Sequence, residues 1–242
     1  MGGADGPCYP WRMGERGFAR FQGEIWGFGT VSGHRVVVGR WADSPFGPFA
    51  DVMHEAADGT RTLLAPTRAV AEFVGGTYGF DRVRIVPVTT ERSSGRLRLE
   101  AGDLSVDVAT GTRTAVGWAL CAVPTPIARS RWWCTLIDPV ARMLMRGVRT
   151  RGTAGNGRRQ WYGVTDQHRL ASVLATLGDD DLGLLSDVWP PVRFGFSSVP
   201  RTPSMVAVTT TISEQAPLLP GPPEAAVTKD GGRRRGRRRQ RR

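Results

Sequence analysis

The feature that most constrains this chain is the close spacing of its turn signals. Pairs such as Asp58-Gly59 and Asn156-Gly157 separate short segments that are rich in β-branched and aromatic residues. Such pairs are strong hairpin signals because asparagine, aspartate and glycine tolerate the backbone angles of a tight turn. The strand-like segments do not alternate with helical ones, so the βαβ units of a parallel sheet are not expected. The sequence therefore predicts a largely antiparallel β-structure.

Strand-like patterns predict about ten strands, most of them paired in hairpins. The first hairpin turns at Ser32-Gly33. Residues 166–177 fit a helix and a strand equally well, because their apolar residues match both periods. The other segments with a strand-like pattern are residues 17–41, 49–66, 83–88, 96–108, 148–163, 193–196 and 205–212.

One or two helices are expected beside these strands. In residues 67–78, Thr67 is a candidate N-cap and the apolar residues, Val70, Phe73 and Val74 among them, mark one face. Residues 124–146 form the second candidate, interrupted at Pro139. Together the patterns predict an α+β domain, mainly antiparallel β, built on a sheet or barrel.

The composition divides the chain into three parts. Residues 1–15 are rich in glycine and proline and are predicted to be flexible. Residues 16–213 form the folded domain, and residues 214–242 are predicted to be disordered. We see no signal peptide at the start, and the longest apolar run, residues 115–128, is too short to cross a bilayer. We therefore expect a cytoplasmic protein.

The net charge of +11 resides mostly in the tail, since residues 233–242 contain eight arginines and no acid. Without these eight charges, residues 1–232 carry only +3. The tail is expected to bind nucleic acid or an anionic surface weakly and without sequence preference; its alternative role is that of a solubilising end. The tail arginines are Arg233, Arg234, Arg235, Arg237, Arg238, Arg239, Arg241 and Arg242.

Lysine is nearly absent, because Lys229 in the tail is the single lysine among 33 basic residues. The predicted domain therefore has no lysine that could form a Schiff base with a carbonyl substrate. Its cysteines, Cys121 and Cys134, lie in apolar or tryptophan-rich surroundings and are expected to be inert.

No pattern in the chain predicts a metal site or a cofactor. The three histidines occur singly on different predicted hairpins and lack metal-ligand spacing. The aspartates of residues 179–181 are interpreted as an acidic turn, and Gly27-Phe28-Gly29 as strand glycines. We expect neither a cofactor nor a metal.

One predicted hairpin, residues 148–163, combines arginines with aromatic residues. Its guanidinium groups could hold a carboxylate, and its rings could stack on a planar ligand. The alternative is a solvated hairpin whose arginine stems cover apolar surface. The residues concerned are Arg149, Arg151, Arg158, Arg159, Trp161 and Tyr162.

Residues 44–51 read Ser-Pro-Phe-Gly-Pro-Phe-Ala-Asp. This segment resembles an element of the acetoacetate decarboxylase superfamily, in which a serine, a glycine, an aromatic residue and a glutamate have the same spacing. In that family the element leads into two strands, a short helix and a stretch that carries the Schiff-base lysine. Residues 63–66, 69–75 and 78–82 follow here at similar spacing. The resemblance implies a cone-like antiparallel β-barrel with a central apolar pocket.

The sequence departs from the family at the lysine. Depending on register, the lysine position is occupied by Phe80, Asp81 or Arg82, and none of these side chains forms an imine. Asp51 stands where the family has a pocket carboxylate. The resemblance therefore implies a pocket that has lost imine-based decarboxylation.

Three functions remain open. The first is a barrel that binds a small carboxylate or keto acid; the second is a lyase or isomerase without an imine, with Asp51 as the catalytic proton carrier. The third is a nucleic-acid-associated protein recruited by the arginine-rich tail. The residues assigned to ligand binding are Asp51, Tyr78, Asp81, Arg82, Arg149, Trp161 and Tyr162.

Overall fold

The computed structural model describes residues 17–145 and 147–213. The predicted flexible start, residues 1–15, and the predicted disordered tail, residues 214–242, lie outside the described residues. Of the three predicted parts of the chain, the structure therefore bears on the domain alone.

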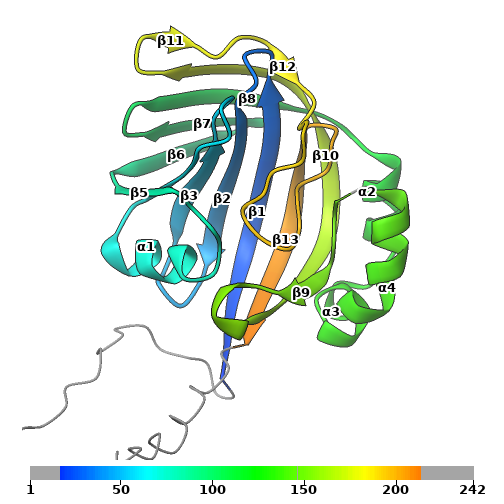
Figure 1. Cartoon of the computed structure of the whole chain (residues 1–242). Helices are drawn as coiled ribbons and strands as arrows, with labels where there is room; N and C mark the ends of the chain where they lie inside the picture. The colour runs from blue at the N-terminus through cyan, green and yellow to red at the C-terminus, as the bar shows by residue number, and fades with distance from the viewer. Residues whose placement is uncertain (1–16, 146, 214–242) are drawn as a thin grey trace, which may run out of the picture.

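The described strands form a single curled sheet (Figure 1). Ten of them are β1 (Phe18–Thr30), β2 (Arg35–Asp43), β3 (Phe49–Glu55), β4 (Arg61–Ala65), β5 (Arg82–Ile85), β6 (Val88–Ser93), β7 (Arg96–Ala101), β8 (Leu104–Arg113), β10 (Arg159–Leu177) and β13 (Ser204–Ser213). Their order is β5-β4-β3-β2-β1-β13-β10-β8-β7-β6. Every pairing is antiparallel except that of β4 with β5. Three short strands lie off this path: β9 (Arg151–Thr153), β11 (Asp180–Asp181) and β12 (Leu185–Ser186).

The predicted hairpins are confirmed. β1 and β2 turn where Gly33 has a φ of +86°, and β3 and β4 turn where Gly59 has a φ of +89°. Glycine is favoured at both positions because a residue with a Cβ atom is strained at positive φ. The third hairpin joins β9 to β10 through Asn156, whose φ is also positive.

Residues 166–177, whose apolar residues fit the period of a helix and that of a strand, belong to the long strand β10. Its pairing with β8 shifts register between His168 and Leu170 and again between Leu170 and Ser172. Each irregularity disturbs the alternation of inward and outward side chains, which is why the strand period was ambiguous in the sequence.

The helices differ from the prediction in two places. α1 (Arg68–Gly75) is capped by the Thr67 hydroxyl, as expected. α2 (Ala115–Cys121) was not predicted, because its apolar run shows no clear amphipathic period. α3 (Thr125–Ala128) and α4 (Arg131–Leu144) occupy the second predicted segment, but α4 continues through Pro139. Pro139 is exposed, so water can solvate the carbonyl group that loses its helical partner.

Residues 193–196, predicted as a short strand, form part of an irregular segment, residues 187–203. The prediction was wrong because this segment is held by side chains rather than by strand pairing. Arg193 is bonded to Glu55 through both its backbone N–H and its guanidinium group.

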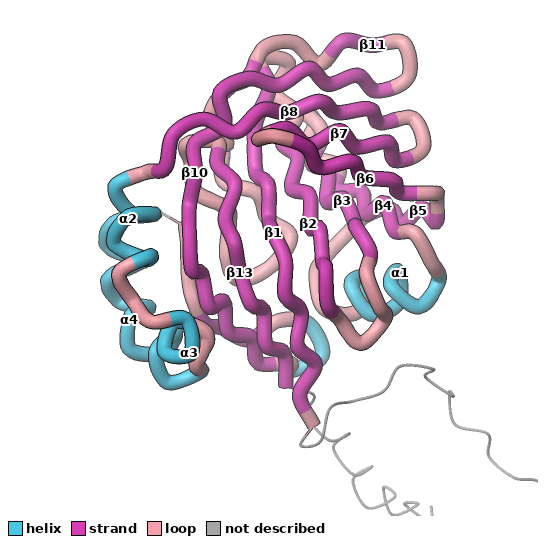
Figure 2. The backbone as a smooth tube through the Cα atoms, turned by 180° about the vertical axis from the view of Figure 1, so that it is seen from behind, coloured by secondary structure: helices cyan, strands magenta, loops and turns pink. Residues whose placement is uncertain are grey.

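One face of the sheet is closely packed. Curling of the sheet brings β6 against β3, as Figure 2 shows from behind. The space between them is filled by side chains from opposite walls, and their rings and branches are completely buried. The members of this cluster with 0% exposure are Trp26, Phe28, Val36, Val38, Val52, Leu97, Leu99, Ala101, Val106 and Val108.

The opposite face is covered by helices and by residues 187–203. α1 packs at one side through the cluster that contains Phe21, Leu63 and Phe73. α2 and α4 pack at the other side against β10 (Figure 1). Within residues 17–145 and 147–213, no helix is both long and apolar enough to span a membrane.

Candidate functional site: an apolar cavity between the sheet and its helices

A cavity of about 440 Å³ lies between the helix-covered face of the sheet, α2, α4 and residues 187–203. The sheet contributes side chains that alternate along each strand with those of the packed face. Most of the lining is aliphatic or aromatic. The lining residues from the sheet and the two helices include Ile25, Val37, Met53, Val164, Val206, Val208, Val116, Leu120, Trp133, Ile137, Val140 and Leu144.

Two tyrosine hydroxyls face each other at this cavity. The Tyr78 and Tyr162 hydroxyl oxygens are 2.8 Å apart, and both lie within 3.2 Å of the Gln160 Oε1 atom. Two hydroxyl protons are shared among three contacts, so at most two of these contacts are hydrogen bonds at one time. A hydroxyl that turns away from its partner can donate its proton to a ligand. Burial raises the pKa of Tyr78 to about 12 and that of Tyr162 well above its usual value. Both groups are therefore neutral near pH 7.

Asp51 lies beside this pair on β3. The Trp41 Nε1–H group donates to the Asp51 Oδ1 atom at 2.9 Å. The contact requires Gly39, since a Cβ atom there would lie 2.6 Å from Asp51 Oδ1 and 2.7 Å from Trp41 Nε1. Asp51 is 1% exposed, and burial raises the pKa of its carboxyl to about 7. Asp51 lies two positions before Met53 on β3, so it shares the strand face of a residue that lines the cavity, and its charge contributes to the raised pKa of Tyr78.

Arg149 supplies a positive charge to the cavity lining. The Tyr162 N–H group donates to the Thr150 carbonyl at 2.8 Å, which places the backbone next to Arg149 alongside the strand of Tyr162. The Arg149 Nε atom is buried and has no hydrogen-bond partner within the described part of the chain. An always-charged guanidinium group with a free donor favours an anion.

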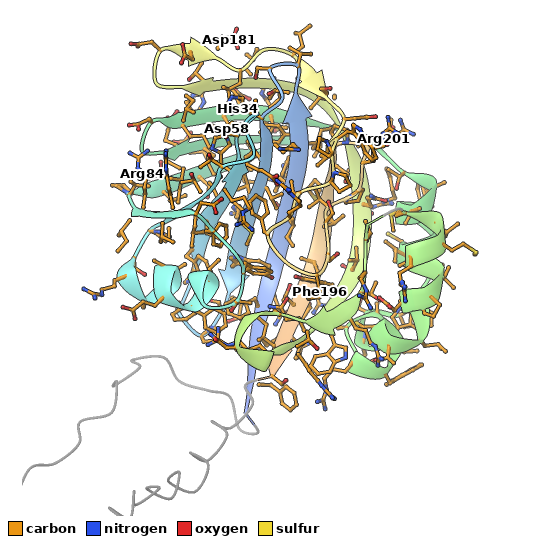
Figure 3. All side chains as sticks on the ribbon, in the orientation of Figure 1. His34, Asp58, Arg84, Asp181, Phe196 and Arg201 are labelled. Carbon is orange, nitrogen blue, oxygen red and sulfur yellow. The ribbon has the colours of Figure 1, made fainter. Side chains whose placement is uncertain are left out.

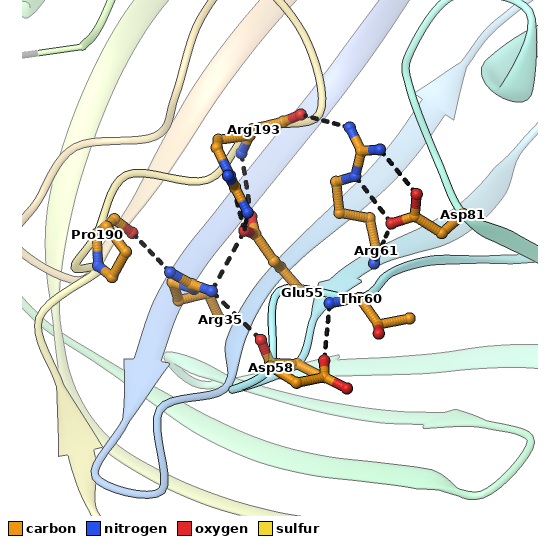
Figure 4. A network of polar contacts seen from close by, with 9 residues as sticks. Arg35, Glu55, Asp58, Thr60, Arg61, Asp81, Pro190 and Arg193 are labelled. Carbon is orange, nitrogen blue, oxygen red and sulfur yellow. Dashed lines mark hydrogen bonds and ion pairs between the residues drawn. The ribbon is translucent and has the colours of Figure 1, made fainter.

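Residues 187–203 are fastened over the cavity by a buried ionic cluster, shown in Figure 4. Glu55 is 0% exposed; it accepts from the Arg193 backbone N–H at 3.0 Å and lies 3.3 Å from the Arg35 guanidinium group. Arg35 in turn donates to the Pro190 carbonyl. Arg61 bonds both the Arg193 carbonyl and Asp81. This part of the cavity wall is thus held by these charges together with a buried apolar cluster that contains Val37, Val192 and Phe194.

The structure brings part of the predicted ligand set together. Tyr78, Tyr162 and Arg149 line the cavity, and Asp51 lies next to it without being part of the lining. The remaining three predicted residues lie elsewhere. Asp81 pairs with Arg61, Arg82 is exposed at the start of β5, and Trp161 contacts Phe18 and Arg131.

Sequence reasoning missed three polar residues of this region: Gln160, Trp41 and Gln167. Gln160 is 0% exposed and its Nε2 atom has no partner among the described residues. Gln160 lies two positions before Tyr162, so the two side chains share one face of the strand. This spacing could have identified Gln160 from the sequence. Nothing local pointed to Gln167, which enters the lining after a register shift in β10.

Two of the three histidines lie together in the fold. Within the described residues, no three His, Cys, Asp or Glu side chains are grouped to hold a metal. His34 and His54 nevertheless meet, with their rings stacked and Nδ1 of His34 2.8 Å from Nε2 of His54. Figure 3 shows His34 and Asp58 together, far from Phe196, whose ring stacks on Tyr162. The pair is therefore separate from the cavity.

Comparisons with known proteins give only a weak structural likeness. No family model matches the chain, and no curated protein matches it. The crystal structure of acetoacetate decarboxylase from Legionella pneumophila subsp. pneumophila str. Philadelphia 1 is 9% identical, with a TM-score of 0.40 over 81% of this chain and 84% of that one. A second structure, titled "Structural Studies of Acetoacetate Decarboxylase", is 9% identical, with a TM-score of 0.38 over 82% and 88%.

Proposed function

We propose that this protein binds a small, largely apolar organic acid in the cavity between the sheet and α2 and α4. The observation that carries the proposal is an apolar cavity of about 440 Å³ with a few polar groups in its lining. Small-molecule sites usually have roughly 300–1,000 Å³ and this division between an apolar lining and a few orienting groups.

The polar groups favour a carboxylate or keto-acid head group. Arg149 would hold the negative charge, and the hydroxyls of Tyr78 and Tyr162 are neutral donors or acceptors beside it. The rest of the ligand would contact the aliphatic residues of the sheet and the two helices.

Imine chemistry has no residue to support it in this domain. Residues 17–213 contain no lysine, and Lys229 lies outside the described residues. Arginine remains protonated and is not nucleophilic near pH 7. The binding proposal therefore does not include Schiff-base decarboxylation.

A second candidate function is proton transfer by Asp51, as in a lyase or isomerase that needs no imine. A buried carboxyl with a pKa of about 7 beside a tyrosine at a cavity favours this role. Because Asp51 is not part of the lining, the proton would pass through Tyr78 or a water molecule.

The binding proposal is tested by thermal unfolding of the full chain with a series of aliphatic and aromatic carboxylates. A ligand at about 100 times its Kd stabilises the folded state by about 2.7 kcal/mol, which is a clear shift in Tm. We expect the shift to be lost in Arg149→Gln and kept in Arg151→Gln, a matched control whose side chain is exposed. The absence of any shift with every carboxylate would reject the proposal.

The same ligands separate binding from catalysis. Asp51→Asn keeps an acceptor for Trp41 but cannot transfer a proton. If the chain is an enzyme, this variant binds the ligand and loses turnover of it, followed by NMR of the ligand. If wild-type protein leaves every bound ligand unchanged, the second candidate is rejected and the first stands.

A further inference from the structure

Helix α4 exposes apolar side chains beside those that face the cavity. Trp133, Ile137 and Ala141 face the cavity. On the adjacent outer side the exposed fractions of Trp132, Leu136 and Met143 are 59%, 62% and 78%. A helix at the surface normally buries its apolar stripe and exposes its polar residues, yet α4 lies at the surface with these large apolar side chains exposed (Figure 1). Its outer side therefore lacks an apolar partner within the described part of the chain.

The exposed apolar surface of α4 reaches the edge of the cavity, and α2, which lines the same cavity, adds an exposed tryptophan. Trp118 on α2 is 63% exposed, with the Arg113 guanidinium group 4.6 Å from its ring centre. Val140 and Leu144 line the cavity and are also 40% and 64% exposed, so the cavity reaches the surface here. We call this surface the helical patch; its members are Trp118, Trp132, Leu136, Val140, Met143 and Leu144.

The charges around the helical patch are almost all positive. The described residues 113–145, which include α2, α3 and α4, contain four arginines and one acid, Asp138. Asp138 is buried and accepts from the Thr150 backbone N–H at 2.8 Å. Arg113 pairs with Asp166, whereas Arg131 and Arg142 form no ion pair with any described residue. This excess of positive charge suits an anionic partner and opposes contact between two identical copies.

The last described residue lies at the same side of the molecule. Ser213 pairs with Phe18, and the guanidinium carbon of Arg131 at the start of α4 is 4.2 Å from the centre of the Phe18 ring. Residues 214–242 follow Ser213 and contain the eight arginines of the tail. The tail is therefore attached close to the helical patch.

We propose that the helical patch docks on an anionic lipid bilayer, with its tryptophan, leucine and methionine side chains at the boundary between headgroups and acyl chains. Tryptophan and leucine on one side of a helix with arginine around them are typical of surface-bound helices, and each arginine near such a surface adds attraction. The cavity edge at Val140 and Leu144 would then face the membrane. Docking does not require the proposed ligand, but it would let an apolar acid enter the cavity directly from the bilayer.

The test is binding of the full chain to vesicles of phosphatidylcholine, alone or with about 30% phosphatidylglycerol. The patch variant combines Trp132→Gln, Leu136→Gln and Met143→Gln. The matched control combines Val31→Gln, Leu174→Gln and Leu184→Gln, which change side chains of 64%, 68% and 73% exposure away from α2 and α4. We expect wild type and control to bind the anionic vesicles, and the patch variant to bind them about tenfold more weakly or worse.

Three results would overturn the proposal. The first is equal binding of the patch variant and the control, which would assign vesicle binding to the tail. The second is a wild-type dimer that the patch variant converts to a monomer, which would make the patch a contact between two copies. The third is binding of oligonucleotides with none to vesicles. Carboxylate binding without vesicle binding would leave the proposed function intact and reject docking alone.

Circular dichroism shows whether the patch variant is folded. If it is not, a second measurement tests the proposal without it. Brominated lipids quench indoles that enter a bilayer, so wild-type fluorescence should fall on anionic brominated vesicles. The quenching should shrink in Trp118→Phe and Trp132→Phe. Unchanged wild-type fluorescence would reject the insertion of the patch.

Discussion

The two faces of the sheet are built from the same strands and filled in different ways. Val38 points into the packed cluster between β2 and β7, whereas its neighbour Val37 points into the cavity. The packed face is closed by strands and filled by a large apolar cluster, with Thr30 and His54 buried near its edge. The cavity face holds empty space and three buried charged side chains, namely Asp51, Glu55 and Arg35. Alternate residues of one chain segment thus serve close packing on one face and the cavity on the other.

The largest expected effect is on the cavity face, at Glu55. Glu55→Gln removes the carboxylate and leaves the guanidinium group of Arg35, which is 3% exposed, without its buried counter-ion. Removing one partner of a buried ion pair lowers the free energy of unfolding by about 3–5 kcal/mol. Urea unfolding should show this loss. Glu72→Gln in the exposed Arg68–Glu72 pair is the control and should change stability by less than about 0.5 kcal/mol. Equal effects would mean that residues 187–203 are not held by Glu55.

A direct comparison of the faces uses two neighbouring valines. Val38→Ala should cost about 2–3 kcal/mol, because it opens a hole in a closely packed cluster. Val37→Ala should cost about 1 kcal/mol, because it enlarges a cavity that already exists. The free energies of unfolding of both variants and of the wild type are measured by denaturant titration under the same conditions. Equal costs would contradict the distinction between the two faces.

Asp51 should make stability depend on pH. Its pKa is about 7 in the folded protein and about 4 in the unfolded chain, so the folded state holds the proton more tightly. Its stabilising contribution is full below about pH 4 and is lost as the pH rises to about 7, at up to about 1.4 kcal/mol per pH unit. Asp51→Asn should remove this slope in a series of unfolding curves from pH 4 to pH 8. An unchanged slope would show that Asp51 is not the titrating group.

The smallest effect on stability is expected where the cavity is filled. Val206→Phe places a ring in the cavity and should change the free energy of unfolding by less than about 1 kcal/mol. It should nevertheless remove the carboxylate-induced shift in Tm. Val106→Phe, the same change in the packed cluster, should be poorly tolerated. A Val206→Phe variant that still binds the ligand would place the site elsewhere.

Much of the sheet was predictable because hairpin signals are local. Asp58-Gly59 and Asn156-Gly157 identified their turns from adjacent residues alone, and the strand patterns on either side followed. The strand predicted at residues 193–196 was wrong because no strand pairs with this segment; Arg193 is instead bonded to Glu55, 138 positions away in the sequence. Local patterns carry no information about such contacts.

The site was predictable only in fragments. Tyr78 and Tyr162 were both singled out, but nothing in the sequence indicated that residues 84 positions apart would share a hydrogen bond. The cavity wall needs α2, whose uniformly apolar run has no clear period, and α4, whose apolar stripe is wider than its contact with the cavity. Asp51 was chosen from a motif resemblance, and its raised pKa arises from burial that no motif encodes.

The pairing of β1 with β13 has a consequence for how the chain folds. These strands are the first and last of the described residues, and they pair from Phe18–Ser213 to Gly27–Ser204 in the middle of the sheet. Contacts between such distant positions slow folding because a long loop must close before they form. During synthesis, the half-sheet made by β1, β2 and β3 would expose an unpaired edge until β13 has left the ribosome. The apolar strands next to that edge are then the part of the molecule most exposed to aggregation or chaperone binding.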